Sequence, residues 1–148
     1  MTVKEYLSQA FRLDQRINAK VEQLSSLNEL ATKCTAVLSG MPGNSTPGKS
    51  TMADTVIKIV ELQKDINNDI DKLVDLKKEI MQLIKAVDDP DLQTLLELRY
   101  LCFKTWEEIA VEMHYSNKWV RIKHANALSA VSAEMNKRVP ESSVEFQV

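Results

Sequence analysis

All three glycines of this chain lie within residues 39–51, a segment that also holds two of its four prolines. Glycine and proline interrupt helices and strands, so this segment is predicted to be a loop. The long stretches on either side contain neither residue, and their apolar residues recur every three to four positions. That spacing favours amphipathic helices, predicted here over residues 3–38 and 52–88. The prediction is an all-α chain.

Both predicted helices carry a heptad repeat, which indicates that they pack against each other. Equal lengths and a short connection favour an antiparallel helical hairpin, or coiled coil, over residues 1–89. Leu62, Leu76 and Leu83 fall outside the repeat, and either a second hairpin in a homodimer or the C-terminal domain would cover them. The predicted seam consists of Val3, Leu7, Ala10, Ile17, Val21, Leu24, Ala31 and Leu38, facing Val56, Ile59, Ile66, Ile70, Leu73, Ile80, Ile84 and Val87.

A second, smaller domain is predicted over residues 90–138. Pro90 disfavours helical geometry in Asp89 and so ends the hairpin. The leucine-rich run that follows is expected to supply most of the domain's core. The acidic segment 139–148 is predicted to be a flexible tail. The apolar residues of the run are Leu92, Leu95, Leu96, Leu98, Leu101 and Phe103.

Within this domain, two short helices joined by a tight turn are predicted. Thr105 and Ser116 are suited to cap their N-termini. Ala110 stands where two steeply crossing helices leave room for only a small side chain, and Val120 supplies the apolar contact from the second helix. This layout is typical of a DNA-binding helix-turn-helix. The turn position that usually carries glycine is His114, which would adopt a positive φ at some cost.

The second helix of the motif, 117–131, concentrates hydrogen-bond donors in its first two turns. These turns would enter the major groove of double-stranded DNA, where such donors suit phosphates and base edges. An ordinary helical hairpin with a solvated basic face is the alternative. The donors are Asn117, Lys118, Arg121 and Lys123.

Residues 43–50 read GNSTPGKS and match the phosphate-loop pattern GxxxxGK[ST]. That pattern binds a nucleotide only between a buried strand and a helix, and the sequence predicts no strand. We expect a chance match, no cofactor and no enzymatic activity. His114 and His124 have no carboxylate at a suitable spacing, and Cys34 and Cys102 stand alone, so neither a catalytic nor a metal site is predicted.

The compartment is predicted from the same residues. Isolated cysteines indicate a reducing environment. The N-terminus lacks the apolar segment of a signal peptide, and no apolar run approaches the roughly 20 residues that a membrane span needs. A cytoplasmic protein without a membrane partner is expected.

The run LLELRYLCFKTWEEIAVEMHYS resembles region four of the bacterial sigma-70 factors. The matching features are LRYL, the triplet Glu108-Ile109-Ala110, the pair Tyr115-Ser116 and the later pair Ala127-Leu128. In that family a helix-turn-helix reads a promoter element. The whole chain also resembles small phage and prophage proteins of Gram-positive bacteria, which are loosely grouped with ArpU-like late-gene regulators.

These resemblances imply transcriptional control from a mobile element, with RNA polymerase as a further partner. The positions that correspond to contacts with base edges are Asn117, Lys118, Arg121 and Ile122. The positions near the phosphate backbone at the start of the preceding helix are Lys104, Thr105 and Trp106. Together with Ser116 and Lys123, these are the DNA-binding residues that we expect.

Three hypotheses follow from the sequence. The first is a sequence-specific DNA-binding transcription regulator, dimeric through the hairpin. The second is a phage DNA-packaging or assembly adaptor resembling a small terminase subunit, which would form a ring of many copies. The third, a nucleotide-hydrolysing enzyme, depends on residues 43–50 alone.

Overall fold

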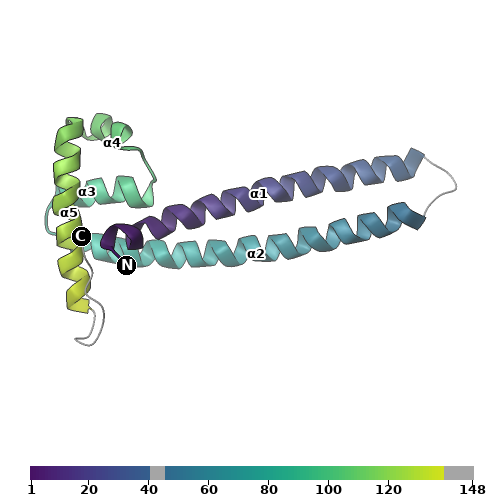
Figure 1. Ribbon diagram of the computed structural model, residues 1–148, viewed down its shortest axis with the longest axis horizontal. Coiled ribbons are helices and arrows are strands. Elements are labelled where there is room, and N and C mark those ends of the chain that lie inside the picture. The colour runs from purple at the N-terminus through teal and green to yellow at the C-terminus, as the bar shows by residue number, and fades with distance from the viewer. Residues whose placement is uncertain (41–45, 139–148) are drawn as a thin grey trace. The chain divides into compact units, whose positions relative to one another are not determined.

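The computed structural model describes the backbone of residues 1–40 and 46–138, and the side chains of residues 1–34 and 52–138. The predicted tail 139–148 and part of the predicted loop 39–51 lie outside these residues. The described chain is helical, without a strand, so the predicted all-α class is confirmed (Figure 1). Its helices are α1 (Val3–Gly40), α2 (Thr46–Lys85), α3 (Pro90–Leu96), α4 (Trp106–Met113) and α5 (Asn117–Arg138), with a π-helical segment η1 (Glu97–Leu101) after α3. Over this part of the chain, no helix is long and apolar enough to cross a membrane.

The chain forms two compact units. The hairpin unit, Leu13–Lys72, contains antiparallel parts of α1 and α2. The C-terminal unit combines Met1–Arg12 with the chain from Leu73 onward. This division differs from the predicted boundary at residue 89, because both ends of the predicted hairpin belong to the C-terminal unit.

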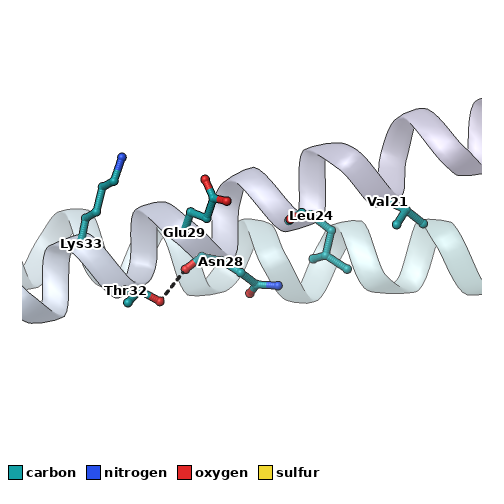
Figure 2. A pocket seen from close by; sticks show the side chains of 7 residues that line it. Val21, Leu24, Asn28, Glu29, Thr32 and Lys33 are labelled. Atoms are coloured by element: carbon teal, nitrogen blue, oxygen red, sulfur yellow. Dashed lines mark hydrogen bonds between the residues drawn. The ribbon is translucent and has the colours of Figure 1, made fainter.

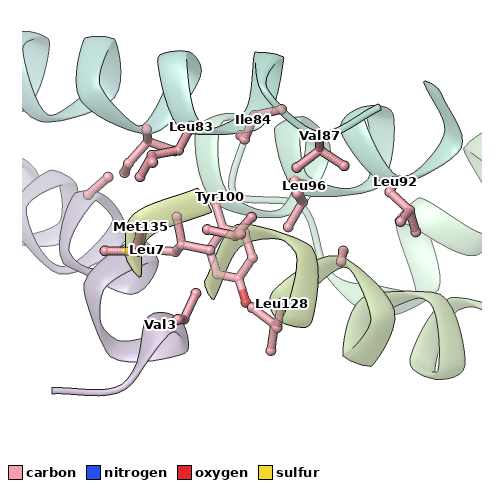
Figure 3. Close-up of a cluster of buried hydrophobic side chains, with 14 residues drawn as sticks. Val3, Leu7, Leu83, Ile84, Val87, Leu92, Leu96, Tyr100, Leu128 and Met135 are labelled. Carbon is pink, nitrogen blue, oxygen red and sulfur yellow. The ribbon is translucent and has the colours of Figure 1, made fainter. Parts of the chain in front are cut away.

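The core of the C-terminal unit explains that difference. Side chains from the start of α1 and the end of α2 meet those of α3, η1 and α5 in one buried cluster (Figure 3). The leucine-rich run therefore supplies only part of this core. Apolar residues that the sequence places in the hairpin complete it. The buried members are Val3, Leu7, Ala10, Ile80, Leu83, Ile84, Val87, Leu92, Leu96, Tyr100, Ala127, Leu128, Val131 and Met135.

Inside the hairpin unit, the seam between α1 and α2 differs from the predicted one. Val21, Val56 and Ile70 were expected to face the partner helix but are 47%, 46% and 40% exposed. Apart from the half-buried Asp14, the residues that are at least partly buried recur at alternating steps of three and four, and these residues form the observed seam. On α1 it consists of Leu13, Ile17, Lys20, Leu24 (labelled in Figure 2), Leu27, Ala31 and Cys34, and on α2 of Met52, Thr55, Ile59, Leu62, Ile66 and Asp69.

A charged pair forms one layer of this seam. Lys20 Nζ lies 2.6 Å from Asp69 Oδ2, and the two side chains are only 22% and 9% exposed. The hydrogen bond from Lys20 lowers the pKa of the Asp69 carboxyl. Apolar periodicity alone could not place these two charges in the seam, and so it assigned the neighbouring Val21 and Ile70 instead.

This arrangement predicts opposite effects for single and double substitutions. Lys20→Met should lower the Tm of the full chain, because the Asp69 carboxylate would remain in the seam without its partner. Lys20→Met with Asp69→Leu should restore or raise the Tm, since both charges are removed and apolar groups fill the seam. Thermal unfolding followed by circular dichroism measures both. An unchanged Tm in the single variant would show that the pair contributes no stability.

Candidate nucleic-acid interface

The start of each helix in the motif is capped as the sequence predicts. Thr105 Oγ1 accepts a hydrogen bond from the backbone N–H of Glu108 at 3.2 Å. Ser116 Oγ accepts one from the N–H of Trp119 at 3.1 Å. Both hydroxyls satisfy helix-terminal donors that would otherwise lack a partner. The caps fix where α4 and α5 begin.

The turn between them uses a left-handed residue. His114 has φ 60° and ψ 40°, and its N–H contacts the last carbonyls of α4. The N–H of Tyr115 donates to the carbonyl of Ala110 at 3.0 Å. The positive φ predicted at His114 is therefore confirmed, in a conformation that ends a helix by reusing its free carbonyls.

A small apolar cluster holds α4 against α5. Its buried members are Leu95, Ile109, Ala110 and Val120. Ala110 is only 6% exposed and Val120 is fully buried, so α5 crosses α4 where the small side chain leaves room. Because Val120 faces inward, the positions on the other side of the first turns of α5 face solvent.

Four of the expected DNA-binding residues occupy that solvent-facing side. Asn117, Lys118, Arg121 and Ile122 are all exposed, and Ile122 is 52% exposed. Neither Lys118 nor Arg121 forms an ion pair with any residue that the structure describes. Ala125, one helical turn further, is exposed on the same side. Alanine carries no hydrogen-bond donor and so gives no signal in the sequence, but a small residue at this position allows close approach to a groove.

The three residues expected near the phosphate backbone at the start of α4 are instead engaged within the protein. The ammonium group of Lys104 pairs with the Glu112 carboxylate, which raises the pKa of Lys104. The Thr105 hydroxyl serves as the helix cap. The Arg99 guanidinium lies over the Trp106 ring, with Arg99 Cζ 4.3 Å from the ring centroid. The Trp106 and His124 rings pack edge-on, with their centroids 4.5 Å apart. Packing accounts for Trp106 without a nucleic-acid contact.

An aromatic stack supports the first turn of α5. The rings of Tyr115 and Trp119 lie 3.6 Å apart at an angle of 12°. Lys123 Nζ lies 5.8 Å from the Trp119 ring centroid. The Tyr115 hydroxyl donates to Asp91 Oδ2 at 3.3 Å, and the charge of Asp91 raises the Tyr115 pKa. The stack thereby links α5 to the start of α3 and places Lys123 beside Trp119.

Behind the interface, His124 is held neutral. Its Nε2 shares a hydrogen bond of 2.6 Å with the Tyr100 hydroxyl. Burial, together with the positive charges of Lys4 and Arg99, lowers the pKa of His124 to about 4. Burial also raises the pKa of Tyr100 to about 12. His124 is a packing residue of the domain and does not face the proposed DNA surface.

The phosphate-loop pattern at residues 43–50 does not follow a strand in the described part of the chain. Thr46–Ser50 form the first turns of α2, and residues 43–45 lie outside the described part of the chain. A phosphate loop joins a strand to a helix, and the described residues contain no strand. Nor do those residues contain a cluster of potential metal ligands.

Comparison with known proteins places the chain in a family. Residues 44–131 match the family model described as "Protein of unknown function (DUF1492)". The chain belongs to this family. The match runs from the start of α2 through α3 and α4 into α5, so it includes the caps, the turn and the exposed positions described above. No curated protein and no solved structure matches the chain.

The cap geometry predicts the effect of changing Thr105. Thr105→Ala should lower the free energy of unfolding by about 1 kcal/mol, because the Glu108 N–H loses its acceptor. Thr105→Ser should retain most of that stability. Urea unfolding of both variants tests this, and a phosphate contact would instead show as a smaller salt dependence of DNA binding with unchanged stability.

The lowered pKa of His124 predicts that the domain loses stability in acid. In the unfolded chain the His124 imidazole binds a proton near pH 6.5, whereas in the folded domain it stays neutral down to about pH 4. Stability should therefore be complete above pH 6.5 and fall as the pH drops towards 4. His124→Phe should flatten this part of the profile, because the substituted side chain no longer binds a proton. Unfolding titrations across this range measure the difference, and identical slopes would contradict the assignment.

Proposed function

We propose that this chain is a sequence-specific DNA-binding transcription regulator that reads the major groove with the first turns of α5. The observation that carries the proposal is the exposed side of these turns. There Lys118 and Arg121 have no ion-pair partner among the residues that the structure describes, and they lie beside the apolar Ile122. Uncompensated cations at the start of the second helix of a helix-turn-helix are suited to DNA.

Each exposed side chain has a contact that fits its chemistry. The planar guanidinium of Arg121 can donate two parallel hydrogen bonds to the acceptors of guanine. Ile122 can contact the methyl group of thymine, and Asn117 can pair with adenine or a phosphate. Lys118 supplies a mobile charge for the backbone. Lys104 contributes less to binding, because DNA must first compete with Glu112 for its ammonium group.

Regulation, rather than DNA binding alone, is inferred from resemblance. The residues of α3 to α5 resemble sigma-70 region four, and the whole chain resembles ArpU-like late-gene regulators of phages and prophages. On that basis we infer a phage-derived regulator that acts at promoters, with RNA polymerase as a second partner. A packaging adaptor would use the same motif but would assemble into a ring, so the mass of the protein in solution separates the two functions.

The proposal is tested by selecting sequences from a randomised pool of double-stranded DNA and measuring affinity for the enriched site at several salt concentrations. We expect an enriched motif and an affinity that falls steeply as salt rises. Arg121→Ala should weaken binding to that site by about 1–3 kcal/mol and relax the preference at one base position. Lys118→Ala should weaken binding to all sequences and reduce the salt dependence.

The matched control is Arg138→Ala, at the far end of α5, where the native guanidinium is paired with Glu134. This variant should bind like the wild type. If no sequence is enriched, or if Arg121→Ala and Arg138→Ala behave alike, specific reading by α5 is wrong.

A further inference from the structure

Lys123 lies on a different flank of α5 from Arg121. Successive residues of an α-helix are separated by about 100° around its axis. Arg121 and Lys123 precede and follow the exposed Ile122, so they lie on opposite sides of it. A helix in the major groove has a sugar-phosphate strand along each flank. Lys123 therefore occupies a position suited to a phosphate on the strand away from Arg121.

The nearest partner of the Lys123 ammonium group is an aromatic ring. Lys123 Nζ lies 5.8 Å from the centroid of the Trp119 ring, within the range of a cation–π contact. Among the described residues, Lys123 forms no ion pair. A ring attracts an ammonium group without neutralising its charge. Lys123 is therefore available to an anion, unlike Lys104, which is paired with Glu112.

The Trp119 ring is itself held in place. It stacks on the Tyr115 ring, with the centroids 3.6 Å apart and the planes at 12°. The Tyr115 hydroxyl donates to Asp91 Oδ2 at 3.3 Å, and the backbone N–H of Trp119 donates to Ser116 Oγ at 3.1 Å. Trp119 is thus fixed through both its backbone and its ring, and it forms a firm support for the Lys123 side chain.

Such a support lowers the cost of binding. Lysine has a flexible four-carbon stem, and fixing it in one rotamer at an interface costs free energy. A contact that already confines the stem in the free protein reduces this cost. Lys123 is half-buried and in contact with a ring. Lys118 and Arg121 are exposed and have no ring contact within the described part of the chain.

We propose that Trp119, supported by Tyr115, is a positioning residue that holds Lys123 for a phosphate of the DNA backbone, on the flank opposite Arg121. This role rests on the proposed function and deepens it, because it adds a contact that is independent of base sequence. Trp119 acts through Lys123 and does not itself contact DNA.

The test is a double-mutant cycle on the affinity for the DNA site enriched from the randomised pool. Lys123→Ala should weaken binding to all sequences and lower the slope of log affinity against log salt by about one. Trp119→Leu should weaken binding roughly two- to fivefold, the loss of an exposed cation–π contact. In the Lys123→Ala background, Trp119→Leu should have no further effect. The matched control is Lys118→Ala, in which Trp119→Leu should keep its full effect.

A conservative variant separates the ring from its polar group. Trp119→Phe keeps an aromatic face for Lys123 but removes the indole N–H, so it should retain most of the affinity. If Trp119→Phe binds as weakly as Trp119→Leu, Trp119 contacts DNA through its N–H and the positioning role is wrong. If Trp119→Leu weakens binding equally with and without Lys123→Ala, its effect comes from the fold of the domain, and the positioning role is wrong again.

The contact between the two side chains is measured without DNA. The ring current of Trp119 should move the ε-methylene protons of Lys123 upfield in the NMR spectrum of the full chain, and Trp119→Leu should abolish this shift. An unshifted resonance in the wild type would overturn the positioning role even if the chain binds DNA. A wild type that binds no DNA would overturn both proposals, whereas DNA binding with additive effects of Trp119→Leu and Lys123→Ala would overturn only this one.

Discussion

The close approach of α4 and α5 at Ala110 is the contact on which the candidate interface depends. Ala110 and Val120 are both buried, and a larger residue at either position would separate the two helices. Their packing turns Val120 inward and thereby turns Lys118, Arg121 and Ile122 outward. The caps at Thr105 and Ser116 and the left-handed His114 then fix the length and angle of the turn. An uncharged contact in the core therefore determines which side chains of α5 are exposed.

The larger core behind this motif includes residues from outside α3 to α5. The helices after Pro90 enclose only the small cluster of Leu95, Ile109, Ala110 and Val120 by themselves, and the larger core needs residues from elsewhere in the chain. The start of α1 and the end of α2 supply the missing ones, with Val3, Leu7, Ile80 and Ile84 buried among the residues of α3 and α5. We infer that truncation at the hairpin boundary would remove part of the core. The start of α1 and the end of α2 are therefore part of the same packed unit as α3 and α5.

Local signals in the sequence predicted the local structure well. Capping hydroxyls, the proline at the start of α3 and the strained turn position each act through the nearest few residues, so the sequence alone reveals them. The π-helical segment η1 and the positive φ of Phe103 were missed. Phe103 is held by tertiary contacts, its ring lying 5.5 Å from that of Phe11 and 4.8 Å from Lys77 Nζ. No pattern of neighbouring residues in the sequence predicts such contacts.

The seam of the hairpin and the expected phosphate contacts of α4 were harder for a related reason. The heptad pattern is read from apolar residues alone. It does not reveal that a lysine and an aspartate can form an ion pair inside a seam, as Lys20 and Asp69 do. In the same way, the sequence shows that Lys104 is basic but not that Glu112 already occupies it. Whether a basic side chain is available to bind a ligand can be judged only once its ion-pair partner in the protein is known. For this reason Lys118 and Arg121, which lack partners among the described residues, carry more weight than the other cations of the motif.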